Sequence, residues 1–313
     1  MPCVVDCNNG NDGANTAMND HYSESPVVFN CEGQRLIGII AQPHHQRIKI
    51  GVLIVVGGPQ YRAGSHRQFT LLARDLAENG IASLRFDYRG MGDSEGEQRA
   101  FDTVDVDIKT AIDCLMQHRP ELTSVIIWGL CDAASAALIY AHHDLRVSGL
   151  ILLNPWVHTE EAAARVRLTQ YYSKRLLQRS FWTKLFSGRF GFFSSSLDLL
   201  KSVRSIKNYI DNSDIKSVAS STQTVTATNF IEKMCSGLQC FQGKVLFILS
   251  GNDLTAQEFI SLKERHRKWR IASQKENISQ HIIPQANHTF SSKKWRNEVS
   301  KSTIWFLDQE KHK

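Results

Sequence analysis

The sequence predicts an α/β protein with a mostly parallel central sheet, helices on both faces and one helical insertion. Short apolar runs with the length of buried strands alternate with longer segments of helical periodicity. The alternation stops after Pro155 and resumes near residue 243. With 313 residues the chain is long enough to bury a large core. We therefore expect a disordered N-terminal tail (residues 1–24), a core (25–155 and 243–313) and a cap insertion (156–242).

Each expected element follows from its apolar pattern and its flanking turn residues. A hairpin is expected over residues 26–42, with its turn at Glu32-Gly33. Further strands are expected at 51–56, 81–86, 125–128, 145–154, 244–250 and 279–283. Helical spacing predicts helices at 66–79, 102–118, 133–141, 255–270 and 294–307, the last with an apolar side of Trp295, Val299, Trp305 and Phe306.

Composition places the chain among ordinary soluble proteins, with 42% apolar and 22% charged residues. No segment approaches the roughly 20 apolar residues that span a bilayer. The first residues lack the basic start and the apolar stretch of a secretory signal, so we expect a cytoplasmic protein. The seven cysteines are accordingly expected as free thiols. The pairs Cys3/Cys7 and Cys235/Cys240 lack the spacing of zinc ligands, and neither a metal nor a cofactor is predicted.

Basic residues are concentrated in the cap insertion. Seven of them lie between Arg165 and Arg189 without one acidic residue, in a chain of net charge +6, and a second cluster runs from Lys263 to Arg270. Such clusters can meet an anionic substrate or lipid headgroups, although most are only solvated surfaces. A peripheral membrane contact through the cap is therefore left open. A nucleic-acid partner is not expected, because no base-reading motif accompanies the charge.

A sharp turn over residues 129–133 is expected between the apolar strand that ends at Trp128 and the Ala-rich helix of residues 133–141. Cys131 would lie at the tip, flanked at two residues on each side by the small residues Gly129 and Ala133 that such a turn requires. The amides of the following helix favour a thiolate at this position. Unpaired cysteines are also often small buried core residues, and the local sequence leaves both interpretations open.

Two further polar residues follow predicted strands. Asp253 comes after the strand 244–250 and His288 after the strand 279–283. Because parallel strands end at one edge of a sheet, Cys131, Asp253 and His288 can converge there as nucleophile, acid and base. Taken singly, His288 could be a surface histidine and Asp253 a helix cap. Taken together, in this order and at strand ends, they favour a catalytic triad.

The segment DYRGMGDSEG, which starts at Asp87, closely resembles the loop after the fourth strand in many α/β-hydrolases. The resemblance covers about residues 27–307 and implies the α/β-hydrolase fold, with the insertion at the position of the cap. The segments VVGGPQYRAGSHRQF and WGLCDAASAAL are similar to the hydrolase 1 proteins associated with the exosortase A system. These proteins accompany exopolysaccharide and protein-sorting genes in Gram-negative bacteria.

The chain departs from most α/β-hydrolases at three positions. Cys131 replaces the usual nucleophilic serine, as in dienelactone hydrolase; Ala133 replaces a glycine; and the first loop has Gly57-Gly58 in place of His-Gly. By position, the backbone amides of Gly58 and Asp132 are the predicted oxyanion donors.

The side chain of Gln60 is predicted as a further hydrogen-bond donor at this site and as a substrate-binding residue. These residues together predict a hydrolase or acyltransferase that forms a thioester on Cys131 from a small acyl ester or thioester, with an anionic or amphipathic portion under the basic cap. The alternative is an inactive binding or scaffold protein with the same fold, serving a membrane or exopolysaccharide assembly system.

Overall fold

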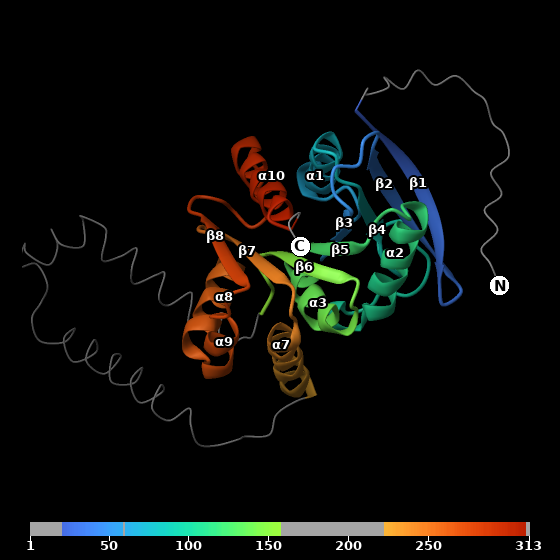
Figure 1. Ribbon diagram of the computed structural model, residues 1–313. Helices are drawn as coiled ribbons and strands as arrows, with labels where there is room; N and C mark the ends of the chain where they lie inside the picture. The colour runs from blue at the N-terminus through green and yellow to red at the C-terminus, as the bar shows by residue number, and fades with distance from the viewer. Residues whose placement is uncertain (1–20, 59, 158–221, 311–313) are drawn as a thin grey trace, which may run out of the picture.

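The computed structural model of the protein describes residues 21–58, 60–157 and 222–310. Within these residues, one eight-stranded sheet runs through the molecule in the order β1-β2-β4-β3-β5-β6-β7-β8 (Figure 1). The strands from β3 to β8 pair in parallel, whereas β2 is antiparallel to both β1 and β4. The strands are β1 Tyr22–Cys31, β2 Gln34–Pro43, β3 Ile50–Val55, β4 Ser83–Asp87, β5 Ser124–Leu130, β6 Val147–Leu153, β7 Lys244–Ser250 and β8 Ile278–Ile283. The predicted mostly parallel sheet is confirmed.

Helices cover both faces of this sheet (Figure 1). They are α1 Gln68–Glu78, α2 Asp105–His118, α3 Asp132–Tyr140, α7 Thr222–Cys240, α8 Leu254–Arg265, α9 Arg267–Ala272 and α10 Lys293–Asp308. Helices α1 and α10 pack on one face, and α2, α3, α7, α8 and α9 pack on the other. Strand β5 shows why both faces are covered. Its side chains alternate between the two clusters, Val125 and Ile127 in one and Ile126 and Trp128 in the other, so an all-apolar strand is buried on both sides.

Two helix predictions need correction. The single helix expected at 255–270 is divided into α8 and α9 at His266, whose extended backbone (φ −86°, ψ 116°) interrupts the helical hydrogen bonding. Trp305 is 56% exposed and does not belong to the apolar side of α10. The predicted Phe306 is buried there together with Leu307, because adjacent helical residues point in different directions and Trp305 lies on the solvent side of the run.

The domain boundaries also differ from the expected ones. Strand β1 begins at Tyr22, three residues before the predicted start of the core at residue 25. Helix α7 lies within the range assigned to the cap, yet its residues Met234 and Leu238 belong to the hydrophobic core. A Cβ on Gly237 of this helix would lie 1.9 Å from the Leu138 carbonyl oxygen of α3, so the two backbones are in close contact. Helix α7 is therefore part of the core.

Residues 1–20 of the tail and most of the cap insertion, including the basic run from Arg165 to Arg189, lie outside the described residues. The predictions of a disordered tail and of a membrane contact through the cap therefore stay predictions. Among the described residues, no helix is both long enough and apolar enough to span a bilayer.

Candidate active site

The predicted sharp turn is present between β5 and α3. Cys131 precedes the first residue of α3 with φ 63° and ψ −123°, a conformation that residues with a Cβ rarely adopt. A Cβ on Gly129 would lie 2.8 Å from the carbonyl carbon of Ala133, so no larger residue fits at that position. The tight turn holds Cys131 half-buried rather than sealed in the core. The five described cysteines are all free thiols, as predicted for the chain as a whole.

Asp253 and His288 meet at the ends of β7 and β8. The Nδ1 atom of His288 lies 2.9 Å from Oδ2 of Asp253. The same carboxylate oxygen accepts a hydrogen bond from the amide of Ala256 at 3.1 Å, so Asp253 also caps α8. The two interpretations that the sequence left open for Asp253, helix cap and partner of the histidine, are thus both correct. The helix cap holds the carboxylate rigidly against the imidazole ring.

The pKa of His288 depends on both Asp253 and Cys131. Hydrogen bonds to Asp253 and to the Cys131 side chain raise the pKa of His288 to about 10, although partial burial works in the opposite direction. The imidazole is therefore protonated through the neutral range. A protonated imidazole beside the sulfur is placed to give its proton to the leaving group of an acyl transfer. The structure brings Cys131, Asp253 and His288 together as the sequence predicted.

The predicted oxyanion donors are arranged differently from the expectation. The Gly58 amide donates to Oδ2 of Asp132 at 2.9 Å, and the Ala133 amide donates to Oδ1 of the same carboxylate at 3.0 Å. An amide that a carboxylate already binds is not free to bind an oxyanion, so the structure does not support the donor role of Gly58. Sequence position alone gave no indication that the Asp132 side chain folds back onto this loop. The role of the Asp132 backbone amide stays a prediction.

Gln60 lies in a loop that other contacts hold in place. Its Oε1 accepts a hydrogen bond from the Ser65 amide at 2.9 Å. Arg62 anchors the same loop, because its amide donates to Oδ1 of the buried Asp87 at 2.6 Å and its guanidinium pairs with Oδ2 of that carboxylate. Gln60 lines a cavity of about 470 Å³ together with Met91 and other residues of the loop after β4. The DYRGMGDSEG motif therefore shapes the cavity that Gln60 borders.

Asn154, which the sequence analysis did not single out, ties the ends of three strands together. It follows β6, is fully buried and has φ 43°. Its Nδ2 donates to the Ser250 hydroxyl at 2.8 Å and to the backbone carbonyl of His288 at 3.0 Å. Its Oδ1 accepts from the Ser250 amide at 2.8 Å, and the Ser250 hydroxyl donates to the Asn287 carbonyl at 2.9 Å. Asn154 is thus a positioning residue for the loop that carries His288. The only sequence signal was a polar residue at the end of the predicted strand 145–154, directly before a proline.

Replacing Asn154 by Ala should lower kcat by about 10- to 100-fold with little change in KM, because the His288 loop loses its anchor. Asn154→Gly is the matched control, since glycine tolerates the positive φ and removes only the side-chain contacts. Steady-state kinetics of both variants check this prediction. Unchanged kcat values in two well-folded variants would show that other contacts are enough to hold the loop.

The described residues contain no group of three or more His, Cys, Asp or Glu side chains placed to bind a metal ion. Of the two cysteines Cys235 and Cys240, the first is buried in the core and the second is exposed. Cys3 and Cys7 lie outside the described residues.

Comparison with solved structures identifies the fold. An esterase of Pyrococcus furiosus is 14% identical, with a TM-score of 0.60 over 92% of this chain and 91% of that chain. A carboxyl esterase of Bacillus coagulans is 16% identical, with a TM-score of 0.59 over 92% and 98% of the two chains. Est1E of Butyrivibrio proteoclasticus, solved with ferulic acid, is 15% identical, with a TM-score of 0.58 over 92% and 100%. At this identity the likeness shows a shared fold, and it confirms the predicted α/β-hydrolase architecture.

The family comparison covers most of the core. None of the curated proteins compared with the chain matches it. The family model described as serine aminopeptidase, S33, matches residues 46–291, which include the turn at Cys131 and the loops of Asp253 and His288. The chain therefore belongs to the serine aminopeptidase S33 family of α/β-hydrolases.

Proposed function

We propose that the protein is a cysteine hydrolase that cleaves a small acyl ester or thioester through Cys131, His288 and Asp253. The observation that carries the proposal is the hydrogen bond from His288 to Asp253, together with the Cys131 side chain, which acts on the same imidazole from the tip of a strained turn. This arrangement supplies a nucleophile, a proton carrier and a group that orients it. The esterase names of the neighbours in the fold comparison agree with an ester substrate.

The reaction follows from the positions of these groups. The Cys131 thiolate attacks the acyl carbon and forms a thioester as the bond to the leaving group breaks. The departing alkoxide or thiolate takes its proton from the His288 imidazolium. His288 then removes a proton from water, the hydroxide attacks the thioester, and the carboxylic acid leaves as the thiolate–imidazolium pair is restored. Asp253 keeps the Nδ1 proton of His288 in place throughout, so that Nε2 exchanges the proton.

The physiological substrate is proposed from the sequence resemblance. The Gly57-Gly58 and Cys131 segments are similar to the exosortase A-associated hydrolase 1 proteins. This similarity supports a substrate that belongs to the same system as exopolysaccharide and protein-sorting proteins. An acceptor other than water would make the protein an acyltransferase through the same thioester. The basic cap would then meet the anionic part of the substrate or of a membrane surface.

One observation favours a second candidate function. The Asp132 carboxylate binds the Gly58 amide. It therefore places a negative charge at the predicted position of the oxyanion, which is itself negatively charged during acyl transfer. A binding protein that has kept the fold without the chemistry would have no need of a free donor there. The two functions differ in whether acyl substrates turn over.

The proposed function predicts that alkylation of Cys131 stops turnover. The screen uses acyl esters and thioesters of graded chain length, with the exposed Cys240 replaced by Ser so that it does not consume reagent. Iodoacetamide should abolish turnover in step with alkylation of Cys131. Peptide mapping by mass spectrometry measures the alkylation. A good substrate should slow the alkylation and the loss of activity. Full activity after complete alkylation of Cys131 would refute the proposal. Absence of turnover with every substrate would favour the binding protein.

A further inference from the structure

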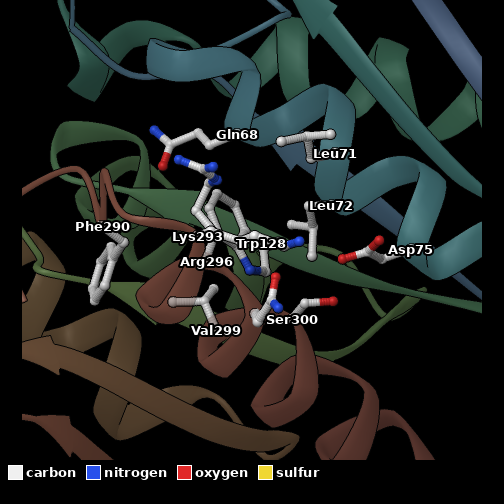
Figure 2. Close-up of a pocket in the computed structure, with 11 residues that line it drawn as sticks. Gln68, Leu71, Leu72, Asp75, Trp128, Phe290, Lys293, Arg296, Val299 and Ser300 are labelled. Atoms are coloured by element: carbon white, nitrogen blue, oxygen red, sulfur yellow. The ribbon is translucent and has the colours of Figure 1, made fainter.

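A second cavity, of about 340 Å³, lies between α1 and α10, on the face of the sheet away from α3 (Figure 2). Trp128 of β5 lines it between the two helices, and none of Cys131, Asp253 and His288 borders it. The cavity has the size of a pocket for a small ligand. Its lining residues are Gln68, Leu71, Leu72 and Asp75 of α1, Trp128, Phe290, and Lys293, Arg296, Asn297, Val299 and Ser300 of α10.

Two buried hydrogen-bond donors at this cavity have no partner. Trp128 is 2% exposed and Gln68 is 7% exposed. Within the described residues, the indole Nε1 of Trp128 and the amide Nε2 of Gln68 make no hydrogen bond. Leaving a buried donor unpaired costs about 1–3 kcal/mol. Both groups can only donate, so the group that satisfies them is an acceptor, and it reaches them only when the side chains that cover the two nitrogens shift.

The charges around the cavity favour an anionic acceptor. Lys293 and Arg296 lie in the first turn of α10, where the amides of the helix add a positive potential. Figure 2 shows both of them toward the Phe290 end of the cavity and Asp75 at the other end. Among residues 21–58, 60–157 and 222–310, no carboxylate pairs with either cation. One Arg296 nitrogen donates to the Ser291 carbonyl, which leaves the other guanidinium donors for a ligand.

The remaining lining is apolar. Leu71 and Leu72 of α1 face Val299 of α10 across the cavity, and the buried Phe290 lies at one end (Figure 2). An occupant therefore meets cations and donors with one part of its surface and aliphatic or aromatic side chains with the rest. This combination matches a carboxylate attached to an apolar body.

We propose that this cavity is a binding site for a small amphipathic carboxylate, separate from the Cys131 site. The carboxylate lies toward Lys293 and Arg296, and it accepts from the unpaired donors of Trp128 and Gln68. The apolar body packs on Leu71, Leu72 and Val299, away from Asp75. The proposal does not depend on catalysis by Cys131, because no residue is shared between the two sites.

Calorimetric titration of the full-length protein with decanoate tests the site, with decanol as the uncharged control. Because a hydrolase active site can also bind a fatty carboxylate, each titration is repeated with Cys131→Ala. Decanoate should bind at one site to the wild-type protein and equally to Cys131→Ala. Arg296→Gln should weaken binding about tenfold, which is the effect of losing one charged hydrogen bond. Trp128→Phe, which removes the indole donor and keeps an aromatic ring, should also weaken binding.

Three results would overturn the proposal. They are no binding of decanoate to the wild-type protein, binding that Cys131→Ala abolishes, and binding that a folded Arg296→Gln variant keeps at full strength. The Arg296 variant keeps the test decisive if Trp128→Phe does not fold, because Trp128 packs edge-on against Phe69 in the core at a ring distance of 5.7 Å, whereas Arg296 is only partly buried.

Discussion

Cys131→Ala should abolish turnover of every ester or thioester that the wild-type protein cleaves, with a loss of about 10⁴-fold or more in kcat. The side chain makes the covalent bond to the substrate, and no other described cysteine lies beside His288. Alanine keeps the Cβ, so the strained φ of 63° and the start of α3 are unaffected. Steady-state kinetics with a chromogenic ester measure the loss.

Cys131→Ser is the matched control, because it replaces only sulfur by oxygen. We expect its activity to be far below that of the wild-type protein, since the raised pKa of His288 suits an imidazolium paired with a thiolate and a serine hydroxyl does not ionise in this range. Wild-type activity in Cys131→Ala, with an unchanged circular dichroism spectrum, would show that the nucleophile lies elsewhere.

Asp253→Asn should lower kcat by about 10³- to 10⁴-fold. The carboxylate is the main cause of the raised pKa of His288, so its removal should bring that pKa down from about 10 toward the ordinary value of 6.5. A lower pKa means that the imidazole loses its proton at a lower pH. The alkaline limb of the kcat/KM profile should therefore move from near pH 10 in the wild-type protein to lower pH in the variant.

The choice of asparagine separates catalysis from folding. Asp253 also caps α8 through the Ala256 amide, and asparagine caps helices equally well. Asp253→Ala removes both contacts and should lose about 1 kcal/mol of stability in addition. An alkaline limb that stays near pH 10 in Asp253→Asn would mean that another group sets the pKa of His288, and NMR titration of the imidazole would identify the change directly.

The convergence of Cys131, Asp253 and His288 could be predicted, because the parallel topology places the ends of their strands at one edge of the sheet. Once β5, β7 and β8 run parallel in one sheet, residues that follow them must share an edge. The small residue Gly129 likewise predicted the tight turn, since its place against the Ala133 backbone leaves no room for a Cβ. These inferences rest on the backbone and on residue size, which a sequence reports well.

The details that depend on side-chain direction could not be predicted. Nothing in the residue order indicates that Asp132 folds back to bind the Gly58 amide, or that Asn154 reaches across to the carbonyl of His288. Both contacts join segments far apart in the chain and depend on the rotamer of one polar side chain. The assignment of α7 to the cap failed for a related reason. The apolar spacing of a helix does not say which surface will cover it.

Trapping the covalent intermediate tests the central claim most directly. The wild-type protein is mixed with a slow acyl ester, quenched in acid and analysed by intact-mass and peptide mass spectrometry. The account predicts one acyl group, attached to the peptide that contains Cys131 and released by neutral hydroxylamine, as a thioester is. An acyl group on another residue, or turnover with no adduct on Cys131 under single-turnover conditions, would contradict it.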